Sequence, residues 1–208
     1  MFKKQKVCLI KNALPTYMVN FLNKYFKIKE AAATKLYEDR YIPEVAHEWG
    51  THMDGQVNGS YSIYGDQAAD TLLITLQPIF EKAIKEKLVP TYSYTRVYKK
   101  GAILAPHKDR LSCDVSTTLC LGGDPWLFWY KKGNKKYSID LKPGDMLAYR
   151  GTEIEHWREP FQGTECVQTF LHYNSAKSEW AEKNKYDGRP CLGLPGYYGH
   201  KIDDKNTR

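Results

Sequence analysis

Three residues of the chain, His107, Asp109 and His156, are of the types that bind metal ions at open catalytic sites. In an extended strand, residues i and i+2 lie on the same face, so the imidazole of His107 and the carboxylate of Asp109 are expected side by side. A second imidazole brought in from another strand, that of His156, would complete a set of two nitrogens and one oxygen. Such a set would hold a metal ion and leave its opposite positions open for a substrate and for oxygen.

Another histidine competes for the place of the second imidazole. His172, in the sequence Phe170-Leu171-His172-Tyr173, also belongs to an expected strand, but its apolar setting is more typical of a core histidine. His47 and His52 belong to an expected loop, where a contact with substrate is the alternative to a purely local role. A His-x-Asp pair arises often by chance, so the metal hypothesis depends on the elements that surround it.

Residues 91–174 form a run of short segments rich in branched and aromatic side chains, separated by turn sequences such as Lys142-Pro143-Gly144-Asp145. Alternating side chains between such turns are typical of antiparallel strands. We expect strands at 92–98, 103–109, 115–121, 126–130, 137–141, 145–150 and 166–173. Many short strands at this spacing favour a jelly roll, the double-stranded β-helix, over a parallel sheet with crossover helices.

The first 90 residues are expected to support this β core mainly with helices. Apolar side chains from Val19 to Phe26 recur at helical spacing. A stronger helical pattern begins after Asp66, a residue type that caps helix N-termini, and Pro78 is expected to kink that second helix. Residues 41–65 have no clean period and are expected to form a long loop.

These patterns predict one structural domain with three regions. A helical support region covers residues 1–90, the jelly-roll core covers 91–174, and a C-terminal extension at 175–208 packs on the core. The predicted fold class is therefore mainly β with supporting α.

The composition of the chain indicates which partners, cysteine chemistry and cellular location are expected. The 31 Lys and Arg residues against 24 Asp and Glu give a net charge of +7, which favours anionic partners without identifying one. The five cysteines are scattered, without Cys-x-x-Cys spacing, which argues against a disulfide framework and against a structural zinc site. No run of 18 apolar residues and no secretory signal are recognised, so no membrane partner is expected and the predicted location is cytoplasmic.

The ligand pattern, a His-x-Asp pair with a distant second histidine, resembles that of the non-haem iron, 2-oxoglutarate-dependent dioxygenases. Tyr98 and Gly101 precede the pair as a tyrosine and a glycine do in the prolyl 4-hydroxylase branch. The turn Lys142-Pro143-Gly144-Asp145 resembles the one that leads to the distal histidine in that superfamily. The resemblance covers residues 92–173.

The resemblance implies a ligand set and a reaction. Fe(II) would be bound by His107, Asp109 and His156, with 2-oxoglutarate as cosubstrate, O2 as oxidant and ascorbate as a supporting reductant. The implied activity is hydroxylation of an unactivated C–H bond, with release of succinate and CO2. The substrate would be a small molecule or a peptide, with a prolyl or other amino-acid side chain among the candidates.

Four residues are candidates for binding the cosubstrate. The family usually places an Arg or Lys after the distal histidine to bind the distal carboxylate of 2-oxoglutarate, but residues 163–168 contain no cation. Tyr98 matches a cosubstrate-binding tyrosine of the family, Arg158 and Arg96 are the nearest cations, and Gln168 offers a hydrogen-bond donor instead. A surface ion pair is the alternative role for each arginine. Trp157 is the aromatic residue expected to border the substrate.

Two other functions stay open from the sequence. A jelly-roll protein that keeps the triad but has lost turnover would be a binding module for a sugar or an anionic ligand, and the missing cation after His156 favours this reading slightly. The basic charge motivates oxidative demethylation of nucleic acid, but no basic and aromatic base-flipping motif is present, so nucleic acid is not the expected partner. The sequence determines neither the substrate nor the oligomeric state.

Overall fold

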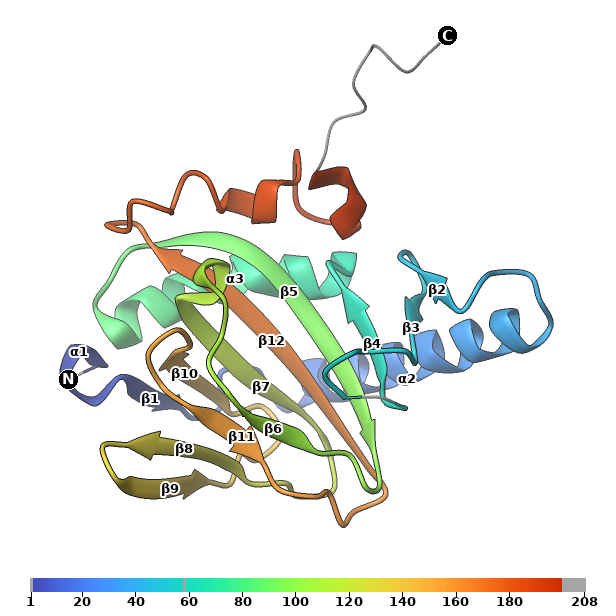
Figure 1. Cartoon of the computed structure of the whole chain (residues 1–208), viewed down its shortest axis with the longest axis horizontal. Coiled ribbons are helices and arrows are strands. Elements are labelled where there is room, and N and C mark those ends of the chain that lie inside the picture. The colour runs from blue at the N-terminus through green and yellow to red at the C-terminus, as the bar shows by residue number, and fades with distance from the viewer. Residues whose placement is uncertain (1, 58, 200–208) are drawn as a thin grey trace, which may run out of the picture.

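The computed structural model describes residues 2–57 and 59–199 as two antiparallel β-sheets with helices against one of them (Figure 1). The larger sheet has eight strands, in the spatial order β1 (Val7–Ile10), β10 (Met146–Arg150), β7 (Val115–Gly123), β12 (Glu165–Ser175), β5 (Leu88–Lys99), β4 (Tyr61–Tyr64), β3 (Gly50–Thr51) and β2 (Val45–Ala46). The smaller has four, in the order β6 (Leu104–His107), β11 (His156–Arg158), β8 (Phe128–Lys132) and β9 (Lys135–Ile139). The predicted class, a jelly-roll core with supporting helices, is confirmed.

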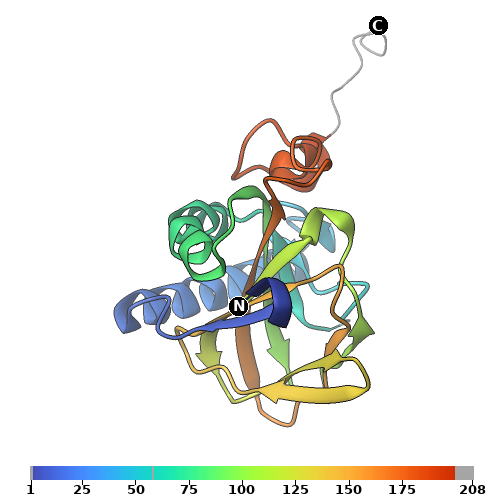
Figure 2. The same ribbon diagram turned by 90° about the vertical axis from the view of Figure 1, so that its left-hand side faces the viewer.

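The helices α2 (Thr16–Glu38) and α3 (Gln67–Ile84) cover the outer face of the larger sheet, and the smaller sheet lies on its other side (Figure 2). The shorter helical pieces are α1 (Phe2–Gln5), η1 (Leu111–Cys113), η2 (Lys185–Gly188) and η3 (Gly196–Gly199). As predicted, Asp66 caps α3, where its Oδ1 accepts the backbone N–H of Ala68 at 2.9 Å. Pro78 lies inside α3, and the helix continues past it.

Alternation along β12 gives the larger sheet two different faces. Val167, Leu171 and Tyr173 are fully buried in the main apolar core with side chains of both long helices. Phe170 and His172, on the opposite face, line a cavity that side chains of the smaller sheet also line. This second face therefore positions polar groups between the two sheets.

The segment 41–65 contains the strands β2, β3 and β4, which corrects the expectation of one long loop there. Tyr61–Tyr64 pairs with β5, and Val7–Ile10 pairs with β10 at the far edge of the same sheet. β4 has only four residues, three of them buried, which is too short a segment to stand out from the surrounding sequence. β2 and β3 have two residues each, which is too short for any period to appear. The three region boundaries stay predictions, and β5 begins at Leu88, just before one of them.

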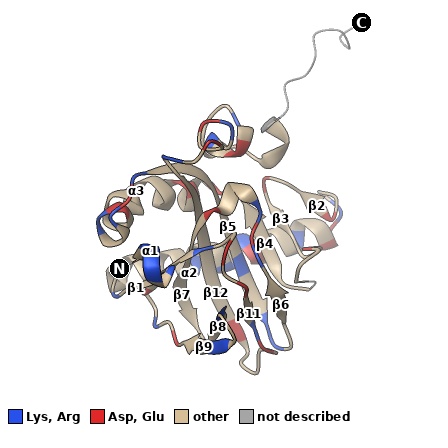
Figure 3. Ribbon diagram, turned by 60° about the vertical axis from the view of Figure 1, so that its left-hand side comes forward, with Lys and Arg blue, Asp and Glu red and all other residues tan. Residues whose placement is uncertain are grey.

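The charged residues and the cysteines are distributed over the structure. Figure 3 shows Lys and Arg residues spread over several elements, among them α1 and β9, and mixed with acidic residues. All five cysteines are free thiols. Among the described helices, none is both long enough and apolar enough to cross a membrane.

The segment after β12 is held to the core by a buried ion pair. Arg189 donates to Asp70 of α3 at 3.0 Å, and both side chains are at most 2 % exposed. The same carboxylate accepts the backbone N–H of Gly193 at 2.7 Å. Arg189 also donates to the backbone carbonyl of Leu194 at 2.6 Å, so both ends of the segment 189–194 are held near α3.

Arg189→Met is expected to lower the free energy of unfolding by about 3–5 kcal/mol, because it leaves the carboxylate of Asp70 buried without its cation. Chemical denaturation followed by circular dichroism measures the change. Lys35→Met is the matched control, since the pair of Lys35 with Asp39 is exposed and should contribute little. Equal unfolding free energies of the two variants would contradict the role given to Arg189.

Candidate metal centre

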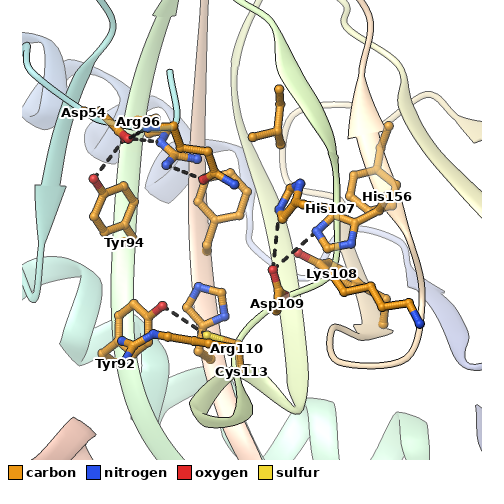
Figure 4. A pocket seen from close by; sticks show the side chains of 16 residues that line it. Asp54, Tyr92, Tyr94, Arg96, His107, Lys108, Asp109, Arg110, Cys113 and His156 are labelled. Carbon is orange, nitrogen blue, oxygen red and sulfur yellow. Dashed lines mark hydrogen bonds and ion pairs between the residues drawn. The ribbon is translucent and has the colours of Figure 1, made fainter. Parts of the chain in front are cut away.

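The three side chains expected to bind a metal converge at one end of the smaller sheet (Figure 4). His107 and His156 face each other across the β6–β11 ladder. Oδ1 of Asp109 lies 3.6 Å from Nε2 of His107 and 3.5 Å from Nε2 of His156. The three potential ligand atoms all lie within 4.8 Å of one another, which is the spacing of donors around one ion.

Asp109 lies just beyond the end of β6, so its position depends on more than strand alternation. Its backbone N–H donates to the carbonyl of Gly151 at 2.9 Å. A Cβ at position 151 would come within 2.2 Å of Oδ2 of Asp109 and 2.4 Å of the carbonyl oxygen of Cys113. Only a glycine at 151 therefore allows this close approach between the two loops.

Hydrogen bonds orient both imidazoles with Nε2 toward the carboxylate. Nδ1 of His107 lies 2.8 Å from the carbonyl oxygen of Ala105, and Nδ1 of His156 lies 3.0 Å from that of Ile154. A carbonyl oxygen only accepts, so Nδ1 carries the proton in both rings and the neutral imidazole keeps its lone pair on Nε2. This pattern is typical of metal-binding histidines.

Electrostatics keep the carboxylate ionised. Burial alone would raise the pKa of Asp109, but the neighbouring imidazoles of His107 and His156 hold that pKa well below its usual range. Burial lowers the pKa of His107, but the neighbouring carboxylate of Asp109 and the carbonyl oxygen of Ala105 together raise that pKa above its usual value. One negative charge thus faces the Nε2 atoms of two imidazoles, and a divalent cation at the centre would be bound by all three groups.

The cluster lies in the wall of a cavity of about 360 Å³ between the two sheets. The cavity is lined by aromatic, cationic and amide side chains from both sheets and from the loop before β4. The lining residues are Asp54, Gln56, Tyr92, Tyr94, Arg96, Leu104, His107, Lys108, Asp109, Arg110, Cys113, Phe128, Tyr149, His156, Phe170 and His172. A volume of this size suits a small molecule or one amino-acid side chain.

Arg96 lines the cavity, but its charge is already compensated. Its Nε donates to Asp54 at 2.6 Å, its Nη2 donates to Gln56 at 2.7 Å, and its guanidinium lies over the ring of Tyr94. The side chain of Arg96 is only 8 % exposed, and that of Asp54 5 %. Sequence reasoning missed Asp54 and Gln56, because nothing in the chain signals which loop residue meets a given strand.

Arg158 is buried without a countercharge. The residue is 1 % exposed, and its guanidinium lies between the rings of Trp126 and Phe128, 5.1 and 5.7 Å from their centroids. It donates to the carbonyl oxygen of Trp126 and, at 3.4 Å, to Thr118. Its Nε has no hydrogen-bond partner, and within the described part of the chain it forms no ion pair with a carboxylate.

Like Arg158, the remaining predicted residues do not line the cavity. Tyr98 is fully buried, with its hydroxyl 3.5 Å from Nη1 of Arg96, and Gln168 accepts from Thr118 at 3.0 Å. Trp157 follows His156 and so points to the opposite side of its strand, where it stacks on Trp129. A substrate contact for Trp157 therefore has no support from its position.

Solved structures share this arrangement of sheets. No family model matches the chain, and no curated protein is similar in sequence. The fold is the one found in 2-oxoglutarate- and Fe(II)-dependent oxygenases. The chain is 15 % identical to a prolyl-4-hydroxylase of Pseudomonas putida, with a TM-score of 0.58 over 84 % of this chain and 95 % of that one.

Two further structures of this fold were solved with ligands. HygX of Streptomyces hygroscopicus, with nickel, 2-oxoglutarate and hygromycin B bound, gives a TM-score of 0.60 at 12 % identity and covers 85 % of both chains. The viral collagen prolyl hydroxylase of Paramecium bursaria Chlorella virus-1, in its 2-oxoglutarate complex, gives 0.56 at 14 % identity over 82 % of this chain and 97 % of that one. At these identities the likeness establishes the fold, and the chemistry has to be argued from the site.

Proposed function

We propose that the protein is an Fe(II)- and 2-oxoglutarate-dependent dioxygenase that hydroxylates an unactivated C–H bond. The observation that carries the proposal is the convergence of His107, Asp109 and His156, with both Nε2 atoms and Oδ1 directed at one point in a cavity wall. Two nitrogens and one oxygen on one side of an ion fit Fe(II) and leave room for other ligands.

The reaction has a simple atom balance. One atom of O2 enters succinate as 2-oxoglutarate loses CO2, and the other enters the C–H bond of the substrate. The bound iron supplies the activation of oxygen, and the chain supplies orientation and exclusion of water. Phe128 and Tyr149, whose rings lie 5.5 and 4.7 Å from that of His156, shield one side of the centre from solvent.

Arg158 is the residue that we assign to the distal carboxylate of 2-oxoglutarate. A buried guanidinium without an anion is costly, and an Nε without a hydrogen-bond partner supports the assignment of an anionic group to this position. Arg158 lies two residues beyond His156 in β11, and its guanidinium reaches Thr118 of the larger sheet, which supports a place for it between the two sheets. Tyr98, Gln168 and Arg96 stay predictions as further cosubstrate contacts.

The substrate is proposed only as a class. Proteins of this fold include a prolyl hydroxylase from Trichoplax adhaerens solved with a peptide fragment and HygX solved with hygromycin B. The cavity here has an aromatic floor that includes Tyr92, Tyr94 and Phe170, with cations at Lys108 and Arg110. A prolyl or other amino-acid side chain, alone or in a peptide, fits this lining and volume.

The proposal predicts affinity for 2-oxoglutarate that depends on the metal. Calorimetry without oxygen should show 2-oxoglutarate binding in the presence of Mn(II) and none after chelation, because the cosubstrate shares its site with the ion. With Fe(II), ascorbate and air, succinate should form and should increase with proline-containing peptides or free amino acids. A binding module that has lost turnover would form no succinate with any of them. If the affinity for 2-oxoglutarate did not depend on the metal, the proposal would be wrong.

A further inference from the structure

His172, which competed with His156 as the second imidazole ligand, lies near the metal centre without belonging to the triad. It is 7 % exposed and lines the same cavity. Its ring lies 4.5 Å from that of Tyr92 and its Nδ1 lies 2.9 Å from Oγ of Ser116. A core role would need only packing, whereas this ring also makes a directed polar contact.

Ser116 connects His172 to the triad. The two residues face each other across the β7–β12 ladder. Oγ of Ser116 lies 2.7 Å from Oδ2 of Asp109 and 3.0 Å from the carbonyl oxygen of Cys113. The hydroxyl has one proton, and the ionised carboxylate at the shorter distance is the stronger acceptor. Ser116 therefore donates to Asp109 and has lone pairs left to accept a hydrogen bond.

The protonation of His172 completes the chain of hydrogen bonds. Burial lowers the pKa of His172 to about 4, so the ring is neutral at physiological pH and carries a single N–H. The hydroxyl proton of Ser116 is directed at Asp109. The contact between Nδ1 of His172 and Oγ of Ser116 is therefore a hydrogen bond only if the single N–H of the His172 ring is at Nδ1. The chain thus runs from Nδ1–H of His172 through Oγ–H of Ser116 to Oδ2 of Asp109.

We propose that His172 and Ser116 are positioning residues of the metal centre. By occupying Oδ2 of Asp109, they fix the carboxylate so that Oδ1 alone faces Nε2 of His107 and of His156, at 3.6 and 3.5 Å. A carboxylate free to rotate would present either oxygen or both, and the metal would meet a less ordered ligand. This inference rests on the proposed function, because it assigns a role around the same ion.

Three variants test the chain, with Mn(II) affinity measured by calorimetry on the full-length protein. Ser116→Ala and His172→Leu should each weaken Mn(II) binding about 10- to 100-fold, the usual effect of removing an outer partner of a ligand. His172→Asn should keep an affinity close to that of the unaltered protein, because the asparagine amide places an N–H near the position of Nδ1–H. Rescue by asparagine separates a hydrogen-bonding role from packing.

Thr169→Val is the control on the same strand. Thr169 shares a buried hydrogen bond of 2.9 Å with Thr95 on the opposite face of the larger sheet, so its loss should affect stability and leave Mn(II) affinity unchanged. Mn(II) affinity of His172→Leu equal to that of the unaltered protein, or asparagine as poor as leucine, would overturn this inference alone. An unaltered protein that binds no Mn(II) would overturn the proposed function with it.

Discussion

Asp109→Asn is expected to abolish metal binding and succinate formation. The carboxylate oxygen lies between the two imidazole nitrogens, and a neutral amide in its place supplies no charge to hold a divalent ion. Removal of an outer partner of a ligand already costs about 10- to 100-fold in affinity, so loss of the charged ligand itself should cost more than about 100-fold. Calorimetry with Mn(II) and quantification of succinate measure the two effects.

Asp39→Asn makes the same chemical change far from the site. Asp39 follows α2 and pairs with Lys35 on the surface, so this control should bind Mn(II) and form succinate as the unaltered protein does. His107→Ala should resemble Asp109→Asn, since it removes a neighbouring ligand of the same centre. Mn(II) affinity unchanged in Asp109→Asn would show that the cluster binds no metal at this point.

The His-x-Asp pair could be predicted from the sequence because its geometry is local. His107 ends a strand and Asp109 follows two residues later, so strand alternation predicts that the two side chains lie near each other, and the loop contact with Gly151 completes the placement of Asp109. His156 required the resemblance to a family, because its strand, β11, has three residues and no readable period. Its register against His107 is set by the sheet, which no local pattern specifies.

The surroundings of the site could not be predicted for a different reason. Asp54 and Arg96 are 42 residues apart and meet only because the loop before β4 folds over the end of β5. Nothing in the sequence distinguishes Ser116 from other serines of the β-rich segment, because its role depends on the pairing of its strand with that of His172. Gly151 is required because a Cβ at that position would collide with Asp109 of another loop. Each of these roles comes from tertiary contacts between distant segments.

Arg158→Met is expected to weaken 2-oxoglutarate binding about 10- to 100-fold, since a hydrogen bond to a charged group contributes about 1.5–3 kcal/mol and each 1.4 kcal/mol is about tenfold. The variant retains the length and apolar character of the stem, so the packing against Trp126 and Phe128 is largely kept. Calorimetry with 2-oxoglutarate in the presence of Mn(II) measures the change. Mn(II) affinity itself should not move, because Arg158 is not part of the triad.

Asp54→Asn distinguishes Arg158 from Arg96 as the cation that holds the cosubstrate. The change removes the countercharge of Arg96 and leaves its guanidinium free in the cavity wall. If Arg96 held the distal carboxylate of 2-oxoglutarate, Asp54→Asn would strengthen 2-oxoglutarate binding, because Asp54 would no longer compete with the cosubstrate for the guanidinium of Arg96. With Arg158 in that role, we expect Asp54→Asn to leave the affinity unchanged while Arg158→Met lowers it. The opposite pattern would move the cosubstrate site from the smaller sheet, where β11 carries Arg158, to β5 of the larger one.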